Sequence, residues 1–189
     1  MYEEIIKQLS DRLSEKRYIH SLNVAKKAKE LAELYGADLE KAYLSGLLHD
    51  IMKETSPEKQ LKLISEGGII VSRDQMMSPK LWHAYSSAVY LRDYLKIEDE
   101  EIFDAVFYHT TGKPDMPTLT KIIYLADMIS EDRDYKELPY LKELSYKNLD
   151  EAVTAALEMS IDFLKEKGSY VCEKTTEALE FMKKGKKDL

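Results

Sequence analysis

The chain contains the segment Tyr43-Leu44-Ser45-Gly46-Leu47-Leu48-His49-Asp50, an apolar helix that ends in a histidine followed by an aspartate. Adjacent helical residues point about 100° apart, so His49 and Asp50 can share a cation only if it lies beside the helix between them. A carboxylate can also bridge two cations, which makes Asp50 a suitable bridge. Taken alone, the pair is better explained as a simple polar helix end, so its interpretation as a metal site depends on the other three histidines.

The pattern around this segment is helical. Only 7 glycines and 5 prolines interrupt the 189 residues, and the stretches between them show helical spacing with little strand alternation. We therefore predict an all-α fold. It is a single helical bundle over 1–189, with its core at about 15–133, short helical additions at both ends and C-terminal helices at about 148–184. A chain of this length needs no disulfide or structural metal to fold, so any bound metal is predicted to serve function.

Caps and helix breakers divide the chain into predicted helices. Ser14 caps a helix that ends at Gly36, and Asp38 caps one that carries Ile51. A proline at the first helical position follows Ser56 and begins a helix that ends at 67–68. The remaining predicted helices cover 5–13, 78–95, 99–109, the segment from a Thr118 cap through Asp127, 149–167 and 173–184.

Composition argues against several classes of protein. The net charge is −7, from 35 acidic and 28 basic residues, so the chain lacks the basic stripe that nucleic-acid backbones need and we predict no DNA binding. The single cysteine, Cys172, excludes an intrachain disulfide and fits a reducing compartment. Because no long apolar run and no basic-then-apolar leader is seen, we expect a cytoplasmic protein with no signal peptide and no membrane association.

All four histidines have neighbours that suit a metal. Taken singly, each is more simply a core, surface or helix-terminal histidine, and His20 follows Arg17 by three residues on one helical face. Four imidazoles with two aspartates nevertheless make a nitrogen and oxygen ligand set suited to one or two divalent metals. The six candidate ligands are His20, His49, Asp50, His83, His109 and Asp127.

Asp127 is the strongest single candidate. It lies in the apolar run Ile122-Ile123-Tyr124-Leu125-Ala126-Asp127-Met128-Ile129. An ionised carboxylate in such surroundings is costly unless it is paired or bound to a metal. The alternative is a salt bridge to Arg133 or to a buried lysine, and we favour the metal.

Two cationic residues lie close to the candidate ligands in sequence. Lys53 follows His49 by four residues, so on a continuing helix it projects near the metal and can hold a phosphate oxygen. Arg133 lies just past the helix that carries Asp127 and can grip phosphate bidentately. The alternatives are a solvated helix lysine and an arginine that pairs with Glu131 or Asp134.

The combined pattern resembles the HD-domain metal-dependent phosphohydrolase superfamily, and within it the YqeK-type branch. The resemblance covers nearly the whole chain. One departure is Met128-Ile129-Ser130, where that branch often has an aromatic residue or Ile-Glu. The matching pieces are Lys16 to Ala25, Leu47 to Lys53, Trp82-His83-Ala84, His109-Thr110-Thr111-Gly112, and Ala126-Asp127-Met128-Ile129 followed by Arg133.

The resemblance implies a symmetrical bis(5'-nucleosyl)-tetraphosphatase, which cleaves diadenosine tetraphosphate into two ADP molecules. It also implies two divalent transition metals, commonly iron, with manganese or magnesium as alternatives. One metal would be held by His20, His49, Asp50 and Asp127, and the other by Asp50, His83 and His109. Asp50 and Lys53 would be the catalytic residues. The implied nucleotide and phosphate contacts are His20, Asn23, Lys53, His83, His109, Thr110, Asp127, Arg133 and Tyr170.

The ligand set predicts hydrolysis without a covalent intermediate. Bound cations lower the pKa of water, the resulting hydroxide attacks an inner phosphorus, and the metals, Lys53 and Arg133 stabilise the developing charge. Three alternatives stay open: another HD phosphohydrolase acting on a nucleoside monophosphate, a deoxynucleotide, or a cyclic or alarmone nucleotide; a di-iron oxygenase; and a non-catalytic nucleotide sensor. The ligands define the reaction class but leave open the substrate and whether the protein forms a homodimer.

Overall fold

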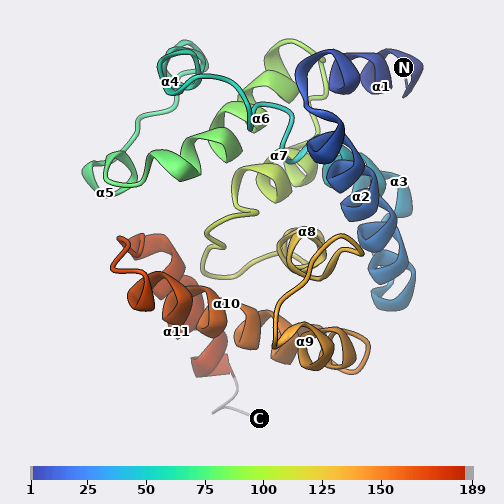
Figure 1. The fold of residues 1–189 in the computed structure, drawn as a ribbon, viewed down its shortest axis with the longest axis vertical. Coiled ribbons are helices and arrows are strands. Elements are labelled where there is room, and N and C mark those ends of the chain that lie inside the picture. The colour runs from blue at the N-terminus through green and yellow to red at the C-terminus, as the bar shows by residue number, and fades with distance from the viewer. Residues whose placement is uncertain (1, 186–189) are drawn as a thin grey trace.

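The computed structural model describes residues 2–185 and builds them from helices (Figure 1). Within this range the chain forms eleven α-helices and one 3-10 helix, and no strand is assigned, so the predicted all-α fold is confirmed. The helices are α1 (Tyr2–Arg12), α2 (Glu15–Tyr35), α3 (Leu39–Leu48), α4 (Pro57–Glu66), α5 (Arg73–Met76), the 3-10 helix η1 (Pro79–Leu81), α6 (Trp82–Asp93), α7 (Glu100–Phe107), α8 (Thr118–Ile129), α9 (Leu138–Ser145), α10 (Leu149–Glu166) and α11 (Glu173–Gly185).

The predicted caps set the ends of the helices that carry the candidate ligands. The Ser14 side chain accepts a hydrogen bond from the Arg17 backbone amide at the start of α2. Gly36 ends that helix in the left-handed conformation, at φ 67°, which a side chain would strain. Asp38 accepts from the amides of Glu40 and Lys41 and so starts α3. These three caps confirm the sequence prediction.

Other boundaries differ from the prediction. α3 ends at Leu48, and Ile51 lies in the turns that follow, where the amide of Ile51 bonds to Leu48 and that of Lys53 to Asp50. The predicted Thr118 cap is wrong, because Pro117 occupies the cap position without a side-chain hydrogen bond. The helix predicted from residue 78 begins as the 3-10 helix η1 before α6.

Two helices were not predicted. α5 is a single turn of four residues, which is too short for apolar periodicity to be seen. α9 has a proline in its first turn and lies in a polar stretch, so its helical pattern is weak in the sequence. Leu138 and Leu141 three residues apart were the available signal for this helix.

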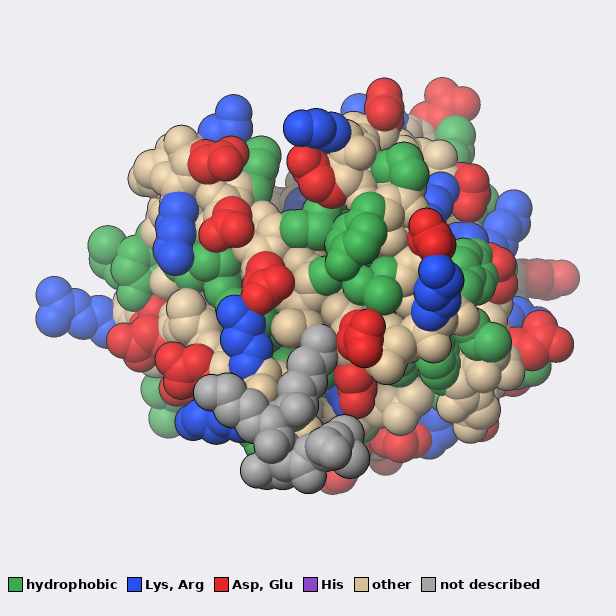
Figure 2. All heavy atoms as spheres, turned by 90° about the horizontal axis from the view of Figure 1, so that it is seen from below, with side chains coloured by type: hydrophobic (Ala, Val, Ile, Leu, Met, Phe, Trp, Pro, Cys, Tyr) green, Lys and Arg blue, Asp and Glu red, His purple; other side chains and the backbone are tan. Residues whose placement is uncertain are grey.

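α8 lies at the centre of the bundle (Figure 1). It contacts α2, α3 and α7 on one side and α9 and α10 on the other. Its residues Ile122, Ile123, Leu125 and Ala126 are fully buried, which explains the apolar run around Asp127. On the face seen in Figure 2, acidic and basic side chains are interspersed. Within residues 2–185 none of the helices combines the length and the apolar character that a membrane crossing requires.

Close packing of α2 against α3 depends on Gly46. A Cβ at this position would lie 2.8 Å from the Ala25 Cα and 3.0 Å from the Ala25 backbone nitrogen, so only a glycine fits without movement of the backbone. This contact brings the helix that carries His20 next to the helix that leads into His49 and Asp50. The glycine in the opening segment therefore positions the site.

Gly46→Ala is expected to destabilise the protein by roughly 1–3 kcal/mol, because the added methyl group must push two backbones apart. The free energy of unfolding is measured by urea denaturation followed by circular dichroism. Gly185→Ala is the matched control, since no atom lies within 4 Å of a Cβ at that position, and it should change stability little. Equal stability of both variants would contradict this account of the packing.

Candidate metal centre

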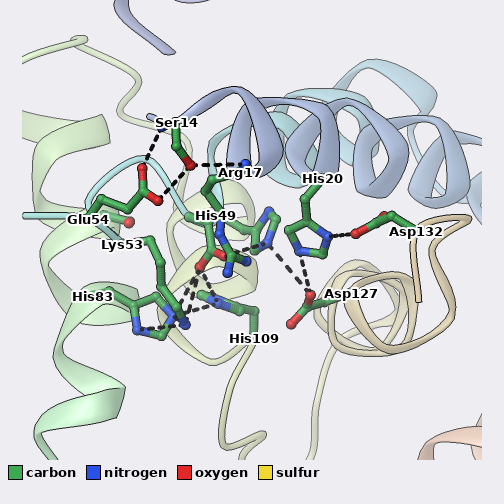
Figure 3. A network of polar contacts seen from close by, with 12 residues as sticks. Ser14, Arg17, His20, His49, Lys53, Glu54, His83, His109, Asp127 and Asp132 are labelled. Carbon is green, nitrogen blue, oxygen red and sulfur yellow. Dashed lines mark hydrogen bonds and ion pairs between the residues drawn. The ribbon is translucent and has the colours of Figure 1, made fainter. Parts of the chain in front are cut away.

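Five separate parts of the fold bring the six predicted ligands together (Figure 3). All are buried except Asp127, whose side chain keeps 19% of its exposure. They form three overlapping groups in which one ligand atom from each residue lies within 4.8 Å of the others. α2 supplies His20, the turn after α3 supplies His49 and Asp50, the first turn of α6 supplies His83, the turn after α7 supplies His109, and α8 supplies Asp127.

Three of the imidazoles are oriented by the backbone of their own turn. In each, Nδ1 lies 2.7 Å from the carbonyl oxygen of the residue three positions earlier. A carbonyl oxygen can only accept, so the proton of the neutral ring is on Nδ1 and the lone pair on Nε2 points into the site. The pairs are His49 with Gly46, His83 with Lys80, and His109 with Val106.

The atoms that face the interior of the site are hydrogen-bond acceptors. Nε2 of His83 lies 3.2 Å from Nε2 of His109 and 3.0 Å from Oδ1 of Asp50. With the ring protons on Nδ1, two lone pairs and a carboxylate oxygen converge. Among the described residues, Oδ1 of Asp50 and Nε2 of His49 are buried without a partner in hydrogen-bond geometry. A divalent cation would satisfy all of these atoms, so the donor set fits a metal.

Asp50 lies between two halves of this cluster. Its Oδ1 faces His83 and His109, at 3.0 and 3.5 Å from their Nε2 atoms. Its Oδ2 lies 3.5 Å from Nε2 of His49. In that half, Oδ1 of Asp127 lies 3.0 Å from Nε2 of His20 and 3.8 Å from Nε2 of His49. One carboxylate therefore reaches both groups of ligands.

The protonation states of His83, His109 and Asp127 also suit metal binding. Burial lowers the pKa of His83 to about 4, and burial likewise lowers the pKa of His109, so both imidazoles are neutral near pH 7. Burial alone would raise the pKa of Asp127, but the hydrogen bond from His20 and the Arg133 guanidinium bring it well below its ordinary value. Neutral imidazole and ionised carboxylate are the forms that bind metals.

Three cationic side chains surround the carboxylates. Arg17 Nη1 lies 2.8 Å from Asp50 Oδ2, and Lys53 Nζ lies 3.9 Å from Asp50 Oδ1 and 3.1 Å from His83 Nε2. Lys53 thus reaches the site, although from a turn and not from the continuing helix that was predicted. Burial lowers the pKa of its ammonium group.

Arg133 pairs with Asp127, which was one of the partners considered from the sequence. Its guanidinium bonds to the Asp127 carboxylate and, through Nε, to the Asp127 backbone oxygen at 2.7 Å. The alternative pairing of Arg133 with Glu131 or Asp134 is not the one that the described residues form. The salt bridge from Asp127 to Arg133, which was the alternative to a metal at Asp127, is present alongside the imidazoles. Asp127 therefore contacts Arg133, as the salt-bridge interpretation predicts, and lies beside the imidazoles of His20 and His49, as the metal interpretation predicts.

The other predicted nucleotide contacts lie around this cluster. Asn23 donates its side-chain amide to Asp132 at 3.2 Å. Thr110 and Tyr170 line one cavity of about 230 Å³, together with Leu81 and Ser169. The Tyr170 hydroxyl is 2.5 Å from Oδ1 of Asp74, which fastens the segment before α11 to α5. Tyr170 therefore lines the same cavity as Thr110, the residue that follows His109 in the sequence.

Sequence reasoning missed three contributors to the site. Arg17 was noted only as a neighbour of His20, although its position three residues earlier on α2 was a usable signal. Glu54 accepts from the Ser14 backbone amide at 2.5 Å and from its hydroxyl at 2.8 Å, which fixes the turn that carries Lys53 to the start of α2 (Figure 3). Asp132 lies 2.8 Å from Nδ1 of His20, and nothing local in the sequence indicated that contact.

A family profile for the HD domain matches residues 17–132, which include all six clustered ligands. The chain belongs to the HD domain family. It is 34% identical to the symmetrical bis(5'-nucleosyl)-tetraphosphatase of Bacillus subtilis strain 168, with 89% of this chain and 90% of that protein covered. It is 36% identical to the protein of the same name from Halalkalibacterium halodurans, with 82% of each chain covered.

A solved structure has the same fold. It is the crystal structure of a predicted HD superfamily hydrolase involved in NAD metabolism from Clostridium acetobutylicum. The two chains superpose with a TM-score of 0.94 at 33% identity, and 96% of each chain is covered. The helical architecture described above is therefore that of an HD superfamily hydrolase.

A divalent transition metal is expected to stabilise the folded protein, because it relieves the repulsion among the converging acceptors. Protein stripped with a chelator should gain about 2.7 kcal/mol for each site when Mn²⁺ is present at a hundred times its Kd. The measurement is thermal unfolding with and without the ion, and EDTA should reverse the gain. An unfolding temperature that does not respond to Mn²⁺, Co²⁺ or Fe²⁺ would contradict the metal-binding interpretation.

Proposed function

We propose that this chain is a metal-dependent symmetrical bis(5'-nucleosyl)-tetraphosphatase, which hydrolyses diadenosine tetraphosphate to two ADP molecules. The observation that carries the proposal is the convergence of acceptors on both sides of Asp50 in a member of the HD domain family. The names of the relatives that match over most of this chain support the substrate. The proposal treats residues 1–189 as one domain, with its core at about 15–133.

The proposed centre holds two divalent metals. His20, His49, Asp50 and Asp127 would hold one, and Asp50, His83 and His109 the other. Iron is the first candidate, with manganese and magnesium as alternatives, because imidazole with carboxylate suits this group of ions. When bound, the metals would lower the pKa of a coordinated water and neutralise charge on the phosphate.

The side chains around the centre have separate tasks in this proposal. Lys53 and Arg17 lie against Asp50, and Arg133 lies against Asp127, so positive charge flanks the centre on both sides. These groups would bind non-bridging phosphate oxygens and stabilise charge that develops there. Cations on both sides would suit an extended tetraphosphate better than a single phosphate.

The cavity beside His109 would take one nucleoside. Thr110 and Tyr170 line it, and its apolar wall includes Leu81 and Leu164. Asn23 and the centre's own His20, His83, His109 and Asp127 complete the proposed contacts. We further propose a cytoplasmic location, in keeping with the reduced thiol of Cys172. Burial first, and then Asp74, raise the pKa of this thiol to about 12, so it is not a nucleophile.

Metal-loaded protein is expected to convert diadenosine tetraphosphate to ADP as the only nucleotide product. Product chromatography in water enriched with heavy oxygen should find one label on the terminal phosphate of one of the two ADP molecules, because water attacks directly. ATP with AMP would show asymmetric cleavage and refute the substrate assignment. A panel that contains nucleoside monophosphates, deoxynucleotides, an alarmone and NAD separates the alternatives, and oxygen consumption tests for an oxygenase.

Asp50→Ala is expected to lose both metals and all detectable activity while the helical content stays unchanged, because one carboxylate serves both halves of the centre. Lys53→Ala should keep both metals but show a raised KM and a lowered kcat. The exposed Lys16 offers a matched control, and Lys16→Ala should behave like the unmodified protein. Metal content is measured by elemental analysis. A fully metallated, active Asp50→Ala protein would show that the centre is misplaced.

A further inference from the structure

The four histidines of the centre differ in what holds their outer nitrogen. For His49, His83 and His109, Nδ1 donates to a neutral backbone carbonyl of the same turn. For His20, Nδ1 lies 2.8 Å from Oδ2 of Asp132, a carboxylate 112 residues away in the sequence. His20 alone among the four therefore has an anionic partner at Nδ1, and this partner comes from a different part of the fold.

Asp132 is itself held in place. Its Oδ1 accepts from the Asn23 side-chain amide at 3.2 Å, while its Oδ2 faces His20. His20 and Asn23 lie three residues apart on α2, so both point to the same side of that helix. The two oxygens of one carboxylate thus contact two positions of α2, which fixes the orientation of Asp132 in the turn after α8. Figure 3 shows Asp132 beyond His20, on the side away from the other three imidazoles.

An anionic acceptor acts on the ligand that it contacts. A hydrogen bond from Nδ1 to a carboxylate is stronger than one to a carbonyl, and it pushes electron density toward Nε2. With a metal bound, it would keep the proton on Nδ1 and hold Nε2 of His20 toward the site, where Oδ1 of Asp127 lies 3.0 Å away. The side chain of Asp132 is 31% exposed, so solvent screens part of this effect but does not remove it.

We propose that Asp132 is a positioning residue that strengthens His20 as a metal ligand. It raises the metal affinity of the position formed by His20, His49 and Asp127. It does not act on the position formed by His83 and His109. The inference rests on the proposed metal centre. It gives Asn23 a task that differs from the nucleotide contact expected for it, since its amide orients Asp132. It also makes the two metal positions unequal, one with an anionic outer partner and one with carbonyl partners alone.

The test is a titration of metal-free protein with Mn²⁺ by isothermal calorimetry. Asp132→Asn keeps an acceptor at nearly the same place and removes the charge. It should weaken one of the two binding steps about tenfold and leave the other unchanged. Asn23→Ala should weaken the same step by less. Asp134→Asn removes a charge two residues away and serves as the control, which should titrate like the unmodified protein. Circular dichroism of each metal-free variant checks that it is folded.

A double-mutant cycle assigns the effect to His20. In a His83→Ala background, only the position with His20 remains, and Asp132→Asn should weaken that single step by the same factor of about ten. In a His20→Ala background, Asp132→Asn should have no effect on the step that remains. A loss of affinity in that background, or an Asp132→Asn protein that binds both ions like the unmodified protein, would overturn the inference and leave the metal centre standing. An unmodified protein that binds no Mn²⁺, Co²⁺ or Fe²⁺ would overturn both.

Discussion

The structure depends on the burial of one carboxylate, that of Asp50, among four imidazoles. An ionised carboxylate in a protein interior is costly unless opposite charges and hydrogen bonds compensate it. Asp50 is 2% exposed, and Arg17, Lys53 and the histidines are arranged around it. Each of these groups comes from a helix, or from the turn that follows one, and the core packing of these helices is apolar, so the surrounding helices fix the polar cluster. The contact of α2 with α3 at Gly46 is one of these packing constraints.

The same cluster explains how an acidic protein can bind an anionic substrate. Each cation at the centre already has a carboxylate partner, Asp50 for Arg17 and Lys53, and Asp127 for Arg133. Divalent metals would neutralise the two carboxylates and so strengthen the positive potential at the site in the proposed enzyme. Metal and phosphate binding are then linked, because the metals would compensate the carboxylates and leave the three cations for the polyphosphate.

Sequence reasoning recovered the parts of the site that are encoded locally. The caps at Ser14, Gly36 and Asp38 follow from the chemistry of single residues, and the rarity of histidine made the candidate ligands visible. Contacts between distant segments were out of reach. Arg17 meets Asp50 across 33 residues and His20 meets Asp132 across 112, and no periodicity connects such pairs. The turn at 49–53 was also missed, because an apolar run does not show where its last hydrogen bond falls.

Different segments of the chain supply the clustered ligands and the cavity wall. The family match ends at residue 132, and the region that it covers contains all six clustered ligands. The cavity lined by Thr110 and Tyr170 has walls from within the matched region and from the chain after residue 132. The matched region supplies Lys80, Leu81 and Thr110, and the later chain supplies Ser160, Leu164, Ser169, Tyr170, Cys172 and Thr175. The hydrogen bond from the Tyr170 hydroxyl to Asp74 joins the later chain to the matched region. Because α10 and α11 supply part of this cavity and none of the clustered ligands, changes in these helices would alter the proposed nucleotide cavity and leave the proposed metal centre in place.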